Sequence, residues 1–125
     1  FDAKTSAAQV LDAGHGYALI IRGQEIILLN ECEGGPPVGA VPGMPFDEST
    51  VPLMSGDRLV IYSDGVAEQR EPASGEEFGV ERVRAALDGS TNPKDDVERL
   101  RASLEAFAGV DRYDDDVTIA CVLIP

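Results

Sequence analysis

Two acidic turns next to apolar segments are the part of this sequence that could do chemistry. An Asp-Gly pair at residues 64–65 follows one apolar run, and three aspartates at residues 114–116 precede the last one. If the two runs are neighbouring strands, the carboxylates converge, and like charges repel unless a cation lies between them. Ligand sets made only of oxygen suit hard ions, namely magnesium, manganese or calcium.

Both turns also have a purely structural interpretation. Asp-Gly is one of the commonest turn dipeptides, because Asp bonds its own backbone and Gly adopts unusual backbone angles. Three aspartates beside Arg112 also fit a solvated loop. The residues alone leave both interpretations open.

The elements that must position these turns are mostly strands. The pattern predicts that the first 30 residues form a β-meander, followed by an irregular Gly- and Pro-rich loop over residues 30–45. Gly56-Asp57 is expected to be a structural turn before the strand that leads to Asp64. The predicted strands cover residues 7–12, 17–22, 24–29, 46–53, 58–63 and 117–124.

Two segments have apolar residues at helical spacing. Residues 77–87 place Phe78, Val80, Val83 and Leu87 on one face, and residues 93–107 form a second amphipathic segment that starts with proline. Strands, then helices, then a last strand indicate an α+β fold of mostly antiparallel sheets with the two helices packed on one face.

Composition excludes several kinds of partner. The formal net charge is −13, from 23 acidic and 10 basic residues, so little is present to neutralise the phosphates of nucleic acid or an anionic membrane. No apolar run approaches a membrane span, and no signal peptide is visible. Cys32 and Cys121 are far apart, Cys121 lies in an apolar run, and a cytoplasmic protein with a buried Cys121 thiol is expected.

Several segments in order resemble the metal-dependent protein phosphatases, specifically the bacterial SpoIIE/RsbU-type relatives of protein phosphatase 2C. The resemblance covers GDRLVIYSDGVAE, EEFGVERV and DDDVTI, together with LDAGHGYALIIRGQEIILL and GGPPVGA earlier in the chain. It extends over nearly the whole sequence. It implies that the sheets are part of a phosphatase 2C-like β-sandwich.

The resemblance also assigns roles to residues of the two acidic turns. Asp64 and Asp115 match family aspartates that bind a pair of divalent metal ions, manganese or magnesium. Gly65 and Asp116 match neighbouring positions that contribute through the backbone or as outer contacts, and Asp114 is expected to be acidic context only. In the family, the metals lower the pKa of a bound water, which attacks the phosphorus of a phosphoserine or phosphothreonine.

One part of the family pattern is missing. The earlier Gly-Asp motif, whose carboxylate bridges both metals in the family, is not present and is expected to lie N-terminal to Phe1, together with the segment that follows it. We therefore expect residues 1–125 to be one partial domain, the C-terminal half of a catalytic domain, which binds metal weakly on its own.

The resemblance implies a serine/threonine phosphatase that acts on a bacterial signalling protein, such as a phosphorylated anti-anti-sigma factor. It also implies an upstream sensory or receiver domain and suggests a homodimer. The alternative from another class is a phosphatase-like domain without catalysis that acts as a regulatory binding module. An unrelated acidic α+β domain without metal is a third interpretation.

Five other residues invite functional interpretations that we discount. His15 is expected to belong to a turn motif rather than to act as an acid, and Arg58 and Arg70 to balance charge rather than bind phosphate. Glu68 is a candidate for an outer contact to the metal site. Ser63 is a candidate for orienting Asp64, since no histidine–acid pair is visible to make it a nucleophile.

Overall fold

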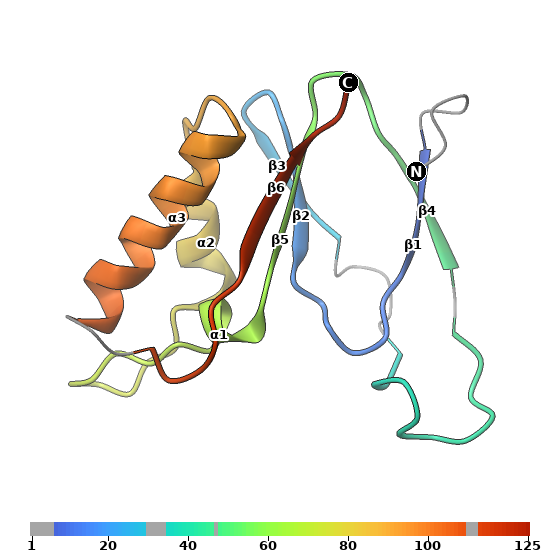
Figure 1. Ribbon diagram of the computed structural model, residues 1–125, viewed down its shortest axis with the longest axis horizontal. Coiled ribbons are helices and arrows are strands. Elements are labelled where there is room, and N and C mark those ends of the chain that lie inside the picture. Colours follow the sequence, from blue (N-terminus) through green and yellow to red (C-terminus); the bar gives the residue numbers. More distant parts are fainter. Residues whose placement is uncertain (1–6, 30–34, 47, 110–112) are drawn as a thin grey trace.

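The computed structural model describes residues 7–29, 35–46, 48–109 and 113–125 (Figure 1). Six strands and three helices occur in these ranges. The strands are β1 (Ala7–Leu11), β2 (Ala18–Arg22), β3 (Glu25–Leu28), β4 (Glu48–Pro52), β5 (Arg58–Tyr62) and β6 (Ile119–Leu123), and the helices are α1 (Asp64–Ala67), α2 (Gly79–Leu87) and α3 (Pro93–Ala108).

The larger sheet has four strands in the order β3-β2-β5-β6, and every neighbouring pair is antiparallel. In the pairing of β5 with β6, Tyr62 lies opposite Ile119 and Val60 opposite Cys121. Because the two strands run in opposite directions, the chain leaves β5 at the same edge where it enters β6. The expected α+β fold with mostly antiparallel sheets is confirmed.

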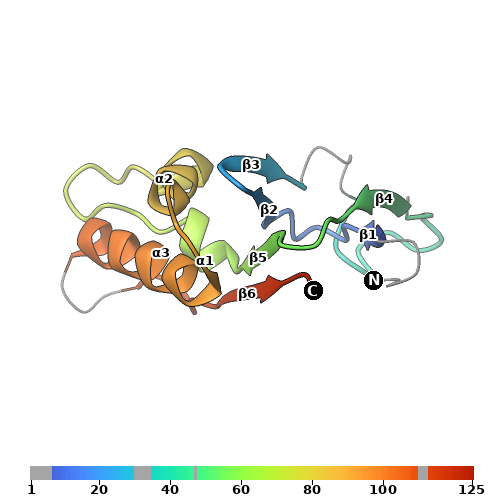
Figure 2. The ribbon, with the colours of Figure 1, turned by 90° about the horizontal axis from the view of Figure 1, so that it is seen from above.

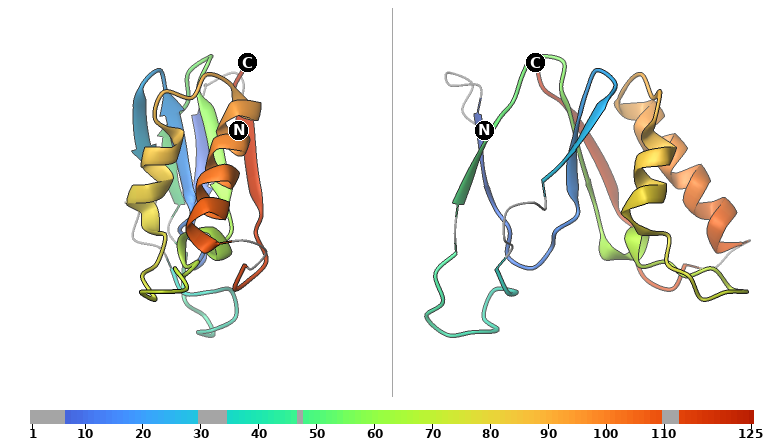
Figure 3. Two further views of the ribbon diagram at one scale, coloured as in Figure 1. Left: turned by 90° about the vertical axis from the view of Figure 1, so that its left-hand side faces the viewer. Right: turned by 180° about the vertical axis from the view of Figure 1, so that it is seen from behind.

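All three helices lie on one side of this sheet, whereas β1 and β4 lie on the other (Figures 2 and 3). Strand alternation explains the two layers, because successive side chains point to opposite faces. The main core joins the sheet to the helices, and a smaller cluster of Ile20, Leu53 and Ile124 faces β1 and β4. The buried residues of the main core include Leu19, Ile21, Val60, Tyr62, Val66, Phe78, Val83, Leu87, Leu100 and Leu104.

The predicted β-meander is wrong for its first strand. β2 and β3 form the expected hairpin, but β1 pairs with β4 in a separate two-stranded sheet. The connection from β1 to β2 turns at Asp12, whose carboxylate accepts the backbone N–H groups of His15 and Gly16. This turn carries the chain from one sheet to the other instead of into a tight hairpin.

The helical region also differs from the prediction at its start. Asp64 begins the one-turn helix α1, where the sequence predicted a turn, so that three helices rather than two cover the sheet. The helix expected from residue 77 begins at Gly79, because Arg70 and Glu77 form a β-bridge and the Phe78 N–H donates to the Gln69 carbonyl. The second predicted helix is confirmed and is capped by Asn92, which accepts the Asp95 N–H.

Some of the sequence predictions concern residues that the structure does not describe. Cys32 and part of the loop expected at residues 30–45 lie outside the described residues. In the ranges that the structure describes, no helix is both long and apolar enough to cross a membrane.

Candidate metal centre

Ser63 joins the end of β5 to the chain that enters β6. Its hydroxyl donates to the Asp116 carbonyl at 2.9 Å and accepts the Thr118 N–H at 2.9 Å. Its own N–H donates to the Thr118 carbonyl at 2.9 Å. These bonds extend the β5–β6 pairing by side-chain contacts into the acidic turn. Ser63 was a candidate for orienting Asp64, but the hydrogen bonds of its hydroxyl hold Asp116 and Thr118 instead.

Gly65 allows this turn to lie directly against α1. A Cβ at Gly65 would come within 2.5 Å of the Asp116 carbonyl oxygen and 3.4 Å of the Asp115 carbonyl carbon. Real Cβ atoms essentially never come so close, so any larger residue would push the two backbones apart. The glycine behind Asp64 therefore serves the close approach of the second acidic turn, rather than a positive φ angle.

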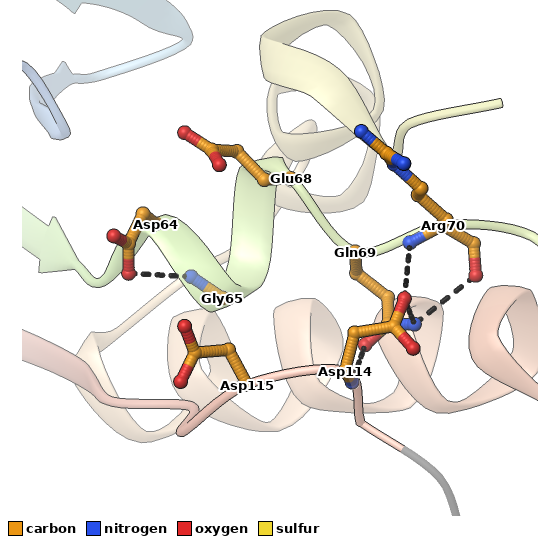
Figure 4. Close-up of a pocket in the computed structure, with 7 residues that line it drawn as sticks. All are labelled: Asp64, Gly65, Glu68, Gln69, Arg70, Asp114 and Asp115. Atoms are coloured by element: carbon orange, nitrogen blue, oxygen red, sulfur yellow. Dashed lines mark hydrogen bonds between the residues drawn. The ribbon is translucent and has the colours of Figure 1, made fainter. Parts of the chain in front are cut away.

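Asp64 and Asp115 face the same cavity, which measures about 350 Å³ and is open to solvent. Each carboxylate accepts a local backbone N–H through its Oδ1 atom, from Gly65 at 2.9 Å and from Asp116 at 2.7 Å respectively. Figure 4 shows the two carboxylates turned toward one another from the two turns. The cavity is lined by Asp64, Gly65, Glu68, Gln69, Arg70, Asp114 and Asp115.

Asp114 has a definite structural role, which the sequence did not indicate. Its Oδ2 atom accepts the Gln69 side-chain amide at 3.1 Å and the Arg70 N–H at 3.2 Å. Its own N–H donates to the Gln69 side-chain carbonyl at 3.0 Å. Asp114 is thus held toward Gln69 while Asp115 points to Asp64 (Figure 4). Sequence reasoning missed Gln69, because one glutamine after a short helix has no distinguishing pattern.

Glu68 lines the cavity and binds Tyr17 from the start of the β2 segment. The Tyr17 hydroxyl donates to Glu68 Oε1 at 2.7 Å. This hydrogen bond to a carboxylate, and then burial, raise the pKa of Tyr17 to about 12. The contact ties the β1–β2 connection to α1 and gives Glu68 a partner inside the protein.

The remaining discounted residues are explained by other contacts. Arg58 is buried and donates to Asp96 at 2.8 Å and to the Ser90 carbonyl at 3.0 Å, so it joins β5 to the helices and faces no phosphate site. The side chain of His15 packs edge-on against Tyr17. Arg70 is exposed beside the cavity, with Glu77 at 3.5 Å.

Asp57 confirms the structural interpretation of the Gly56-Asp57 turn. Both of its carboxylate oxygens accept from the Arg22 guanidinium, at 3.0 and 2.7 Å, and one also accepts the Met54 N–H. The hydrogen bonds from Arg22 hold the pKa of Asp57 below its usual value despite its burial. Cys121 is half-buried, and burial together with its hydrogen bond to Asp96 raises its thiol pKa to about 12.

The carboxylate oxygens around the cavity can supply some, but not all, of the ligands of a hard divalent cation. The carboxylates of Asp64 and Asp115 offer the oxygen ligands that magnesium and manganese prefer. Within the described ranges, no group of three or more His, Cys, Asp or Glu side chains is arranged to hold a metal ion. Glu68 and Asp114 line the same cavity, but their carboxylates accept hydrogen bonds from Tyr17 and Gln69.

Comparison with known proteins identifies the family of this chain. The chain matches the family described as stage II sporulation protein E (SpoIIE) over residues 1–125. It is 27% identical over 123 residues to protein IcfG of Synechocystis, an alignment that covers 90% of this chain and 19% of that protein.

Solved structures of low sequence identity share the fold. The PP2C phosphatase domain of SpoIIE from Bacillus subtilis, solved with a fragment of its regulatory domain, has a TM-score of 0.81 at 21% identity, over 99% of this chain and 36% of that one. The same phosphatase domain presoaked with manganese has a TM-score of 0.73 at 20% identity, over 99% and 53%. This chain thus spans less than two thirds of each of these proteins.

Proposed function

Since this chain belongs to the SpoIIE family of PP2C-type phosphatase domains, we propose that it supplies two metal ligands of a protein serine/threonine phosphatase. The ligands are the carboxylates of Asp64 and Asp115, and the ions are manganese or magnesium. Residues 1–125 would then be part of a single catalytic domain. The further carboxylates would come from the portion of the domain that the solved relatives contain in addition.

One observation carries the proposal. The antiparallel pairing of β5 and β6 brings Asp64 and Asp115, 51 positions apart in the sequence, to one cavity, and the turn of Asp115 lies directly on Gly65. Two acidic loops would ordinarily separate, because like charges repel. Ser63 instead holds them together by hydrogen bonds at 2.9 Å. A bound divalent cation accounts for the construction of such a site.

The residues of this chain hold and orient the ions. The N–H groups of Gly65 and Asp116 each donate to one oxygen of the Asp64 and Asp115 carboxylates and so fix their orientation, which leaves the second oxygen of each without this backbone bond. When bound, the metals supply a water of lowered pKa as the nucleophile toward phosphorus. Gly65 and Asp116 contribute through the backbone or as outer contacts.

The substrate is proposed to be a phosphoserine or phosphothreonine of a bacterial signalling protein, such as an anti-anti-sigma factor. The cavity is open to solvent, which supports a substrate side chain that is presented by another protein. The Bacillus subtilis relative carries a regulatory domain, which supports an upstream sensory or receiver module for this chain too. A homodimer is part of the same proposal.

The test is phosphatase activity of the full-length protein with manganese. A phosphoserine or phosphothreonine peptide is the substrate, with a phosphotyrosine peptide for comparison. Asp64→Asn and Asp115→Asn are expected to lose most of the activity. Asp88→Asn, which removes the same charge from an exposed position at the end of α2, is expected to keep it. Full activity in both ligand variants would contradict the proposal.

A further inference from the structure

The turn that carries Asp115 has no regular structure of its own. It precedes β6, whose first residue is Ile119, and it is exposed at residues 113–116. Its position therefore depends on specific contacts from elsewhere. Ser63 holds the end nearest β6, through Asp116 and Thr118. Gln69 holds the other end, through Asp114.

Gln69 is a buried polar side chain with both of its amide atoms engaged. It is 2% exposed. Its Nε2 group donates to Asp114 Oδ2 and to the Arg70 carbonyl, both at 3.1 Å, and its Oε1 atom accepts the Asp114 N–H at 3.0 Å. Asp114 presents an acceptor and a donor on the same side. An amide matches both, whereas a carboxylate or an apolar side chain cannot.

The backbone of Gln69 is anchored in the core. Its carbonyl accepts the N–H of Phe78 at 2.8 Å, and Phe78 is 1% exposed at the start of α2. Phe78 in turn packs edge-on against Phe107 of α3, with ring centroids 5.3 Å apart. Gln69 therefore connects the packed helices to an otherwise exposed acidic turn.

We propose that Gln69 is a positioning residue that selects Asp115, rather than Asp114, as the metal ligand. By binding the Asp114 carboxylate, Gln69 holds it on its own side of the cavity and leaves Asp115 as the aspartate of this turn that lies beside Asp64 (Figure 4). The inference rests on the proposed function, because it takes Asp64 and Asp115 as ligands. Outer contacts of this kind change metal affinity by about 10- to 100-fold when removed.

Two substitutions that exchange the hydrogen-bond donor and acceptor between Gln69 and Asp114 test this role. Gln69→Glu places a carboxylate against that of Asp114, and is expected to weaken Mn²⁺ binding by about tenfold or more. In the double variant Gln69→Glu/Asp114→Asn, the Asn amide donates to the new carboxylate, so the hydrogen bond between the side chains is restored in the opposite direction. Affinity is expected to recover in part, because the donor from residue 69 to the Arg70 carbonyl is not restored.

The measurement is calorimetric titration of the full-length protein with Mn²⁺, with thermal melting of each metal-free variant. Gln24→Glu adds the same charge to the exposed β2–β3 turn and serves as the matched control. If Gln69→Glu does not fold, Asp114→Ala replaces it, because Asp114 is exposed and leaves no core cavity. Asp114→Ala is also expected to lower the affinity for Mn²⁺ by about tenfold.

The outcomes separate the inference from the function on which it rests. Recovery of affinity in the double variant supports positioning, because a general loss of stability would not be reversed by a second substitution. Unchanged affinity in Gln69→Glu, or no recovery in the double variant, overturns the inference alone. If the unmodified protein binds no Mn²⁺, or Asp64→Asn binds equally well, the proposed function fails and the inference fails with it.

Discussion

The Ser63 hydroxyl donates to the Asp116 carbonyl at 2.9 Å and so joins the end of β5 to the turn before β6. The two residues are 53 positions apart in the sequence. Asp64 follows the first and Asp115 precedes the second, so this contact helps to keep the two candidate ligands at one cavity. Several measurable consequences depend on it.

Ser63→Ala is expected to lower the free energy of unfolding by about 1–2 kcal/mol, because the Asp116 carbonyl and the Thr118 N–H both lose a partner. Chemical denaturation measures this change. Ser74→Ala, which removes a hydroxyl bound to Glu71 in an exposed turn, is the control and should change stability by less than about 0.5 kcal/mol. Equal effects of the two substitutions would show that the Ser63 contact does not hold the turn.

Gly65→Ala is expected to displace the Asp115 turn, since the added Cβ would lie 2.5 Å from the Asp116 carbonyl oxygen. Overpacking of this kind costs about 1–3 kcal/mol, and Mn²⁺ affinity should fall as well. Gly23→Ala provides the comparison, because its Cβ meets nothing within 4 Å and only the positive φ of +61° is strained. Chemical denaturation and Mn²⁺ titration measure both effects. Unaltered Mn²⁺ affinity in Gly65→Ala would contradict the expected displacement.

The strands and helices that could be predicted from sequence are those with a long enough run of patterned residues. Strands β5 and β6 were foreseeable, because each is an apolar run of strand length beside an acidic turn, whereas their pairing was only the condition on which the site depended. Helix α3 was foreseeable from Pro93 and its first-turn aspartates. The pairing of β1 with β4 was not, because alternation identifies a strand but not its antiparallel partner.

The supports of the candidate site were harder to predict than its acidic residues. Asp64 and Asp115 stand in recognisable motifs, but α1 has only four residues, too few for a helical period to be visible. Gln69 and Tyr17 act through contacts to residues more than 40 positions away. Such pairs depend on the tertiary fold, and nothing in their neighbouring residues marks them.

The hydrogen bond from Tyr17 to Glu68 predicts a change of stability at alkaline pH. The folded-state pKa of about 12 lies above the ordinary value of 10.0, so the contact stabilises the fold below pH 10. That contribution is lost as pH rises from about 10 through about 12. Glu68→Gln should lower the pKa of Tyr17 toward 10.0, as followed by NMR of labelled tyrosine rings. An unchanged Tyr17 pKa would exclude Glu68 as the main cause, and Tyr113 serves as the internal control.

Asp115→Asn is expected to have opposite effects on stability with and without metal. In the metal-free protein, removal of one of two converging charges should leave the melting temperature unchanged or raise it. With Mn²⁺ present, the variant should be less stable than the original protein, since binding at about 100 times Kd stabilises by about 2.7 kcal/mol. Thermal melting with Mn²⁺ and with a chelator checks both signs. Equal stabilisation of both proteins by Mn²⁺ would exclude Asp115 as a ligand.

The most direct test of the central claim, that Asp64 and Asp115 hold the same ions, is paramagnetic broadening of backbone amide signals by Mn²⁺ in the full-length protein. We predict that substoichiometric Mn²⁺ broadens the amides of Gly65 and Asp116 together and leaves Gly23, in the distant β2–β3 turn, sharp. Asp64→Asn should then weaken the broadening at both turns. Broadening of only one turn, or broadening that persists unchanged in Asp64→Asn, would contradict a shared metal centre.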